Sequence, residues 1–180
     1  MERKLTHIAL FAALIAALGL VPKFEIYPGL GITAQSMGVM LCGTVLGARA
    51  GGLAALLFVA LMSLGLPIWA GGIGGPGIYL TPKVGFVIGF PVGAYVAGWV
   101  MERLSGQVAV SAFVAAVLGG MVALYACGIP GMAWALGKSL PEAATIALAF
   151  IPGDLIKAVL AALITQAVAR ARPGALLSRA

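Results

Sequence analysis

The chain has 180 residues, of which 62% are hydrophobic and 9% are charged, and its mean hydropathy is +1.13. A soluble domain carries about 25% charged residues, so this composition excludes a soluble enzyme, and it equally excludes a disordered chain, which needs low hydrophobicity. The net charge of +6 comes from cations scattered between long apolar runs rather than from a basic stripe. That pattern argues against nucleic-acid binding and is typical of membrane topology signals.

The first half of the chain predicts three transmembrane helices, each of which needs about 20 predominantly apolar residues. They lie at about 5–21, 32–46 and 53–66. The first run also fits a secretory signal peptide, but no small-x-small cleavage site follows it and further spans come after, so we retain it as a helix. The segment 22–29, with two prolines and a pair of charges, predicts a water-exposed loop, and 47–52 predicts a tight polar turn.

The second half opens with a glycine-rich loop at 67–82 and predicts three more helices. These spans lie at about 83–101, 107–127 and 152–169. The last is started at Pro152, because a proline in the first helical turn removes an N–H that has no partner there. Residues 130–151 are then expected to form a long, partly apolar loop, with a short interfacial helix over about 141–149. We therefore expect one all-α integral membrane domain with six transmembrane helices.

The cations predict the orientation of these six helices. An even number of spans puts both termini on one side, where seven cations gather: Arg3, Lys4, Arg49, Arg103, Arg170, Arg172 and Arg179. The opposite side has three, Lys23, Lys83 and Lys138, and Lys157 is counted with neither because it lies inside the last span. The positive-inside rule then places both termini in the cytoplasm of a multi-pass protein of the inner (plasma) membrane. The glycine-rich loop and the start of the last helix face outward.

Asp154 and Lys157 are the strongest functional signal, because a charge at mid-bilayer costs roughly 2.5–3.5 kcal/mol and intramembrane ionisable residues are functional by default. They are three residues apart, so they share one helical face. Asp154 also lies in a first helical turn, where the helix dipole favours an anion. The alternative is a helix cap beside a lysine that reaches the membrane interface. An acid and a base at an outward-facing helix end suit a small ligand that has both donors and a carboxylate.

The loop 67–82 is the second signal. Its glycines, Gly72 and Gly75 among them, let the backbone approach a ligand closely or move as a lid. Trp69 and Tyr79 are suited to stack on an apolar ring system. The alternative is a flexible connector with interfacial aromatic residues, which membranes favour.

Small residues recur every four positions on the first predicted helix, at Ala9, Ala13 and Ala17. In lipid this spacing lets helices pack closely, but it does not say whether the partner lies in the same chain or in another protein. His7 is the single histidine, and no His, Cys or carboxylate cluster suits zinc, so we expect no metal and no hydrolytic site. The stretch 131–139 superficially resembles a phosphate-binding loop but has the wrong glycine spacing and no preceding strand. No ATP site is therefore expected in this chain.

Three stretches in order along the chain resemble the BioY family, the biotin-specific substrate-binding (S) components of energy-coupling factor (ECF) transporters. They are Ile32–Leu41 entering the second span, Gly65–Pro76 in the loop, and Pro152–Lys157 opening the last span. The resemblance covers nearly the whole chain and implies the six-helix S-component fold, with biotin as the ligand rather than a cofactor.

The resemblance also implies roles for particular residues. Asp154 and Lys157 match the family's ligand-site residues in its Gly-Asp-Leu-x-Lys stretch, and the glycine-rich loop is similar to the family's cap over the ligand. The alanine pattern at 9, 13 and 17 is similar to the S-component motif that docks a transmembrane coupling subunit, and a separate pair of ATPases is then expected to drive the cycle. The resemblance implies a transport component and not an enzyme.

The chain departs from the family pattern in three respects, one of which is that Gly31 stands before Ile32 where the family usually has a proline. Where the family commonly has Gly-Pro-Thr-Gly-Gly-Tyr, this chain has Thr81–Phe86, so Lys83 is a new charge and a candidate partner for a carboxylate. The chain contains no asparagine, so we expect Gln35, Thr33, Asp154 and backbone amides to hold the ureido group of biotin. Three alternatives remain: an S component for a different vitamin, a structural membrane subunit, and a membrane enzyme acting on lipid, which lacks a catalytic constellation here.

Overall fold

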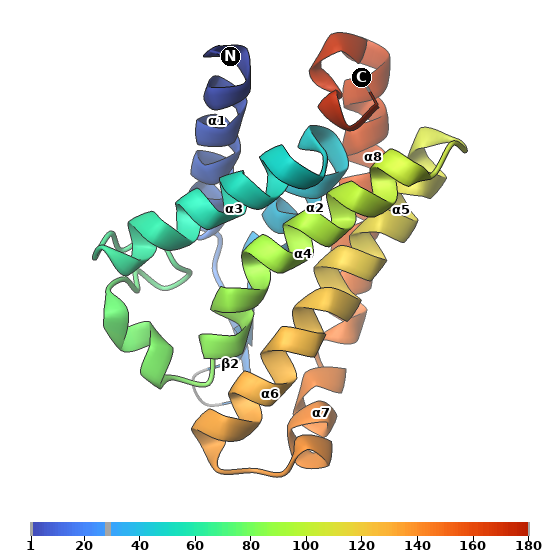
Figure 1. Ribbon diagram of the computed structural model, residues 1–180. Helices are drawn as coiled ribbons and strands as arrows, with labels where there is room; N and C mark the ends of the chain where they lie inside the picture. The colour runs from blue at the N-terminus through green and yellow to red at the C-terminus, as the bar shows by residue number, and fades with distance from the viewer. Residues whose placement is uncertain (1, 28–29, 180) are drawn as a thin grey trace.

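The computed structural model describes residues 2–27 and 30–179 and shows helices packed side by side with a two-stranded hairpin between the first two (Figure 1). The first half contains α1 (Glu2–Leu18), β1 (Phe24–Tyr27), β2 (Leu30–Ile32), α2 (Gln35–Leu46), α3 (Ala48–Ser63) and a 3₁₀ turn at Pro76–Leu80. The second half contains α4 (Val84–Arg103), α5 (Val108–Val117), a π-helical turn (Leu118–Ala123), α6 (Leu124–Leu136), α7 (Leu140–Leu148), α8 (Ile151–Ala171) and 3₁₀ turns at Pro173–Ala175 and Leu177–Arg179.

Every predicted span overlaps a helix, but the polar turn predicted at 47–52 is wrong in its extent. Helix α3 begins at Ala48, which leaves Gly47 alone as the turn, with a positive φ of 84° that favours glycine. At the start of α3, Glu102 from the end of α4 accepts a hydrogen bond from the Ala48 backbone N–H at 2.8 Å, which satisfies one of the helix N–H groups that have no partner within the helix. A carboxylate distant in sequence therefore takes the place of a local cap.

The loop predicted to begin at residue 130 is also wrong for residues 130–136. Helices α5 and α6 and the π-helical turn between them run continuously over Val108–Leu136. The glycines around Pro130 pack directly on α4: Gly128 lies against the Phe86 ring and Gly131 against the backbone of Gly85. This close packing outweighs the helix-breaking tendency of glycine and proline. The helix ends at Gly137, whose left-handed conformation is a common helix C-terminus.

The hairpin replaces part of the loop predicted at 22–29, of which Pro28 and Gly29 lie outside the described residues. Strands β1 and β2 are antiparallel, with Phe24 opposite Ile32. The short helix predicted at 141–149 is confirmed as α7, which starts in a capping box formed by Ser139 and Glu142. The hydrogen bond from the Ser139 side chain lowers the pKa of the Glu142 carboxyl, because it stabilises the charged form.

Helix α2 forms the centre of the molecule. All of its residues except Met37 are buried, and it packs against α1, α3, α4 and α8. Such all-round burial is why its apolar residues follow no single face. Its first turn therefore lies deep inside the bundle, where side chains from several other helices can reach it.

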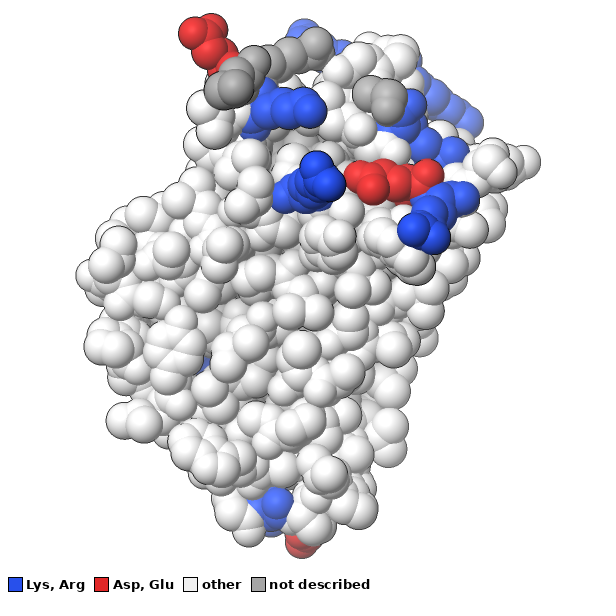
Figure 2. Space-filling view, in the orientation of Figure 1, with Lys and Arg blue, Asp and Glu red and all other residues white. Residues whose placement is uncertain are grey.

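The exterior of the bundle is apolar. Helix α8, for example, exposes Leu155, Ile156, Val159, Leu160, Leu163 and Ile164. Charged side chains instead gather at the two ends of the molecule, most of them at the end where α1 begins and α8 finishes (Figure 2). Within the described residues, α4, the segment Val108–Leu136 and α8 are long and apolar enough to cross a membrane. Together these features define a multi-pass membrane protein.

Candidate ligand-binding site

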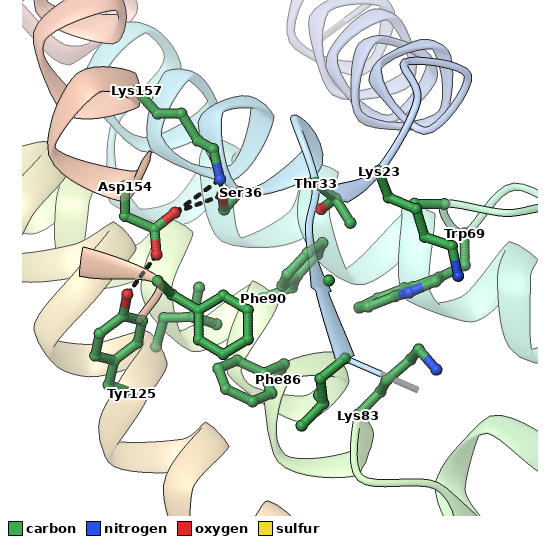
Figure 3. Close-up of a pocket in the computed structure, with 15 residues that line it drawn as sticks. Lys23, Thr33, Ser36, Trp69, Lys83, Phe86, Phe90, Tyr125, Asp154 and Lys157 are labelled. Carbon is green, nitrogen blue, oxygen red and sulfur yellow. Dashed lines mark hydrogen bonds and ion pairs between the residues drawn. The ribbon is translucent and has the colours of Figure 1, made fainter. Parts of the chain in front are cut away.

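The carboxylate of Asp154 meets three other polar side chains inside the bundle (Figure 3). Its Oδ1 atom accepts hydrogen bonds from Lys157 Nζ at 2.8 Å and from Ser36 Oγ at 3.2 Å, and its Oδ2 atom accepts one from Tyr125 Oη at 2.5 Å. Lys157 Nζ also donates to Ser36 Oγ at 3.0 Å. Asp154 is only 5% exposed. The four residues therefore form a compact, buried polar cluster in an otherwise apolar interior.

Three helices bring this cluster together. Asp154 lies in the first turn of α8, where the helix dipole stabilises its negative charge, and Lys157 follows one turn later on the same face. Ser36 lies in the first turn of α2. Tyr125 lies on α6, just after the π-helical turn, and its ring packs edge-on against Phe86 at 6.4 Å between centroids.

The cluster forms one end of an internal cavity with an open mouth. The opposite end carries Lys23 and Lys83 (Figure 3), which come from the segment before β1 and from the start of α4. The rest of the lining is mostly apolar and aromatic and includes Trp69, Phe86, Phe90, Leu124 and Phe150, with Phe86 and Phe90 between the two ends (Figure 3). The cavity has polar groups at both ends and an apolar middle, an arrangement typical of small-molecule sites.

Trp69 forms part of the cavity wall. Its ring stacks on Phe90 with 5.0 Å between centroids and a 27° interplanar angle, and Phe90 in turn stacks on Phe58. The backbone of Trp69 pairs with that of Ile73 in a tight turn. Gly71 and Gly72 occupy the middle of this turn with φ of 88° and 72°, a conformation that favours glycine.

The residues predicted for the site divide into two groups. Thr33, Trp69, Lys83, Asp154 and Lys157 line the cavity. Gln35, Gly72, Gly75 and Tyr79 do not line it. Tyr79 is hydrogen-bonded to Ser63 at 2.7 Å, and the Gln35 amide is engaged by backbone groups of α1 and of the glycine-rich loop. A role in ligand contact for these four residues stays a prediction, and the structure shows them shaping the loop and its supports.

Sequence reasoning missed several lining residues. The sequence predicts a loop around Lys23 and an apolar span around Tyr125, and both residues line the cavity. Tyr125 carries the sharper signal, because a hydroxyl in the middle of an apolar membrane helix needs a hydrogen-bond partner. For Ser36 and the aromatic residues there was no comparable signal, since serine and phenylalanine are common throughout membrane helices.

The alanines predicted to contact a coupling subunit, Ala9, Ala13 and Ala17, are all exposed on the outer face of α1. The contact itself stays a prediction. Among the described residues, no group of three or more His, Cys, Asp or Glu side chains is arranged to hold a metal ion.

The fold and the cavity thus define a helical, multi-pass membrane protein with an internal site for a small molecule, and comparison with known proteins narrows this class. The sequence model of the BioY family matches residues 2–174. The biotin transporter BioY of Rhodobacter capsulatus is 48% identical, over 99% of this chain and 100% of the relative. The biotin transporter BioY of Rhizobium etli is 49% identical, over 92% of each chain.

A solved structure, the S-component for biotin from an ECF-type ABC transporter, superposes with a TM-score of 0.88 at 29% identity and covers 94% of this chain and 92% of its own. The chain belongs to the BioY family, as its three sequence stretches indicated.

Proposed function

We propose that this chain is the biotin-binding membrane component of a vitamin uptake transporter. Its membership of the BioY family, its biotin-transporter relatives and its structural likeness to a biotin S-component all support this function. The observation within the molecule that carries it is the cavity itself. A polar cluster around Asp154 lies at one end, two lysines lie at the other, and aromatic side chains line the cavity.

The polar cluster matches the ureido group of biotin. A carboxylate has about four lone-pair sites, and Asp154 uses three of them for Lys157, Ser36 and Tyr125. The remaining site accepts a ureido N–H, while the Lys157 ammonium donates to the ureido oxygen. The bicyclic ring then packs against Phe86, Phe90 and Trp69, which exclude water from these hydrogen bonds.

The two lysines match the other end of biotin. Its valerate chain ends in a carboxylate, and Lys23 and Lys83 both line the far end of the cavity. An ammonium group binds a carboxylate through charge-assisted hydrogen bonds. This orientation gives each end of the ligand a partner of complementary charge or hydrogen-bonding capacity.

Uptake requires partners beyond this chain. We place the exposed alanines of α1 against a transmembrane coupling subunit, because small residues four apart allow close helix contact in lipid. A separate pair of ATPases supplies the energy, biotin is cargo, and the chain needs no cofactor of its own.

In the membrane we propose six crossing segments with both termini in the cytoplasm of the cell. Besides the three long helices, the described residues include three shorter apolar helices, Lys4–Leu18, Gln35–Leu46 and Ala48–Ser63. The ends that carry Arg49, Arg103 and Arg179 lie together, since Ala48 bonds to Glu102 and Arg179 bonds to Gly106. The positive-inside rule assigns this end to the cytoplasm.

The function is tested by calorimetric binding of biotin to the purified chain, with other vitamins as competitors. We expect biotin to bind and the others not to displace it. Displacement by a different vitamin would identify an S component for that compound instead. No biotin binding by the wild-type chain would overturn the proposal.

The ligand orientation is tested with biotin and its uncharged amide. Lys83→Met and Lys23→Met should each lower biotin affinity by about ten-fold, since hydrogen bonds to charged groups contribute roughly 1.5–3 kcal/mol, and should leave affinity for the amide unchanged. Lys138→Met is the matched control, because Lys138 lies in the α6–α7 turn and does not line the cavity. An equal loss for biotin and its amide would contradict the orientation.

A further inference from the structure

Gln35 is fully buried, and its side-chain amide joins three separate segments of the chain. Its Nε2 atom donates to the carbonyl oxygen of Ile15 at 3.1 Å and to that of Ile68 at 2.9 Å. Its Oε1 atom accepts from the backbone N–H of Ala70 at 2.9 Å. The end of α1, the start of α2 and the glycine-rich loop are thus held by one side chain.

This arrangement requires a carboxamide. Two of the three backbone partners are acceptors and the third is a donor, so the side chain must supply two N–H groups and one oxygen. A carboxylate of the same shape would face two carbonyl oxygens, and an apolar side chain would leave three buried backbone groups unpaired. Each buried backbone group left unpaired destabilises the folded state.

The two loop residues that Gln35 binds, Ile68 and Ala70, lie on either side of Trp69. Trp69 and Ala70 line the cavity, whereas the next two residues, Gly71 and Gly72, are exposed. This turn is therefore a thin wall between the cavity and the outside of the protein. Its inner side is the Trp69 ring, which is 6% exposed and stacked on Phe90.

We propose that Gln35 is a positioning residue that holds the Trp69 wall closed and thereby sets how long the ligand stays in the cavity. The proposal rests on the proposed biotin site, but assigns Gln35 a role different from ligand contact. Because the amide bonds flank Trp69, movement of this wall breaks both loop hydrogen bonds together. A ligand can then leave past Trp69 only after those bonds break, which raises the activation free energy for its dissociation.

Gly19 offers an independent way to disturb the same contact. A Cβ atom at Gly19 would lie 2.8 Å from Gln35 Nε2 and 2.8 Å from the Ile68 oxygen, which is too close for either atom to stay in place. Gly19 has no positive φ, so alanine is compatible with its backbone. Gly19→Ala therefore disrupts the hydrogen bond between the Gln35 amide and the Ile68 carbonyl while leaving the Gln35 side chain itself intact.

The test uses this chain with Trp99 and Trp134 replaced by phenylalanine, so that of the three tryptophans in the sequence only Trp69 remains. In this background, Gln35→Met and Gly19→Ala are compared with Thr44→Val. Thr44 is equally buried and loses a hydrogen bond to Thr165, but it does not line the cavity. Two quantities are measured: acrylamide quenching of Trp69 without ligand, and the dissociation rate of radiolabelled biotin.

We expect Trp69 to be quenched more strongly in both Gln35→Met and Gly19→Ala, and biotin to dissociate about ten-fold faster, as the loss of one or two net hydrogen bonds predicts. Thr44→Val should match the parent in both measurements. Folded variants with parental quenching and parental dissociation would overturn the proposal.

The two measurements separate this proposal from the proposed function. If the parent binds no biotin, the biotin assignment fails, while the quenching of Trp69 still decides whether Gln35 holds the wall. If Gln35→Met does not fold, Gly19→Ala decides the same question.

Discussion

Asp154 and Lys157 form an ion pair with N–O separation of 2.8 Å, and their side chains are only 6% and 13% exposed. Removing two charges from water is unfavourable unless their mutual attraction and further hydrogen bonds compensate. Ser36 and Tyr125 supply those further bonds to Asp154. The pair is therefore stable as a unit, and each residue depends on the other.

Single substitutions should expose that dependence. We expect Asp154→Asn or Lys157→Met to lower the free energy of unfolding by about 3–5 kcal/mol, because each leaves a buried charge without its partner. The joint variant Asp154→Asn/Lys157→Met should recover most of this stability. Thermal unfolding in detergent measures these changes.

Biotin binding should behave differently from stability. All three variants should lose biotin affinity, by more than about ten-fold, because each lacks a group that holds the ureido end of the ligand. Calorimetry on the stable joint variant is decisive, since misfolding no longer explains a loss. Wild-type affinity in that variant would show that the two residues have a structural role only.

At the scale of helices, close packing depends on glycines where backbones meet. A Cβ atom at Gly43 of α2 would lie 2.5 Å from both the Ala94 oxygen and the Ala97 Cβ atom of α4. Because α2 is buried and α4 packs against α2, α3 and α6, this contact fixes the distance between the helices that carry Ser36 and the aromatic cavity wall.

Gly43→Ala should therefore lower the free energy of unfolding by about 1–3 kcal/mol through overpacking. Gly77→Ala is the matched control, because a Cβ atom there would meet no other atom within 4 Å and the backbone is not in a positive-φ conformation. Thermal unfolding of the two variants, followed by circular dichroism in detergent, makes the comparison. Equal midpoints would contradict the importance of this helix contact.

At the scale of the whole molecule, the charged side chains define two ends separated by an apolar middle (Figure 2). The end that carries both termini of the chain is held together by polar contacts between segments that are distant in the sequence. Ser178 donates to the Thr44 carbonyl at 2.5 Å, and Arg179 reaches the carbonyl of Gly106. The tail after α8 is therefore part of the folded end that we assign to the cytoplasm.

Orientation in the membrane is tested by labelling one cysteine at each end. Ser139→Cys and Ser105→Cys, both exposed positions, are made separately in a Cys127→Ala background, where the remaining Cys42 is buried. In right-side-out vesicles an impermeant maleimide should modify Ser139→Cys at once. It should modify Ser105→Cys only after the membrane is permeabilised. The opposite pattern would reverse the proposed topology.

The sequence predicts those features of the fold and the site that are visible within one segment, and not those that depend on contacts between distant segments. Asp154 and Lys157 were found because a charge within an apolar run is conspicuous in the sequence itself. Gln35 shows the limit: because the chain has no asparagine, Gln35 is one candidate to hold the ureido group, and that role stays a prediction. The sequence did not indicate that its amide is bonded to the backbone of α1 and of the loop. Nothing local indicates which partner a buried amide will find.

The helix boundaries likewise depend in part on local sequence and in part on contacts with distant segments. The sequence alone determined the membrane environment and the approximate position of every long helix, because hydropathy along the chain reports which segments avoid water. Only the tertiary structure decided that residues 130–136 continue a helix, since the glycines there pack on α4. Likewise, Ser36 and Asp154 meet across 118 positions of sequence. Such contacts are set by how helices pack, which depends on the shapes of both partners and not on either segment alone.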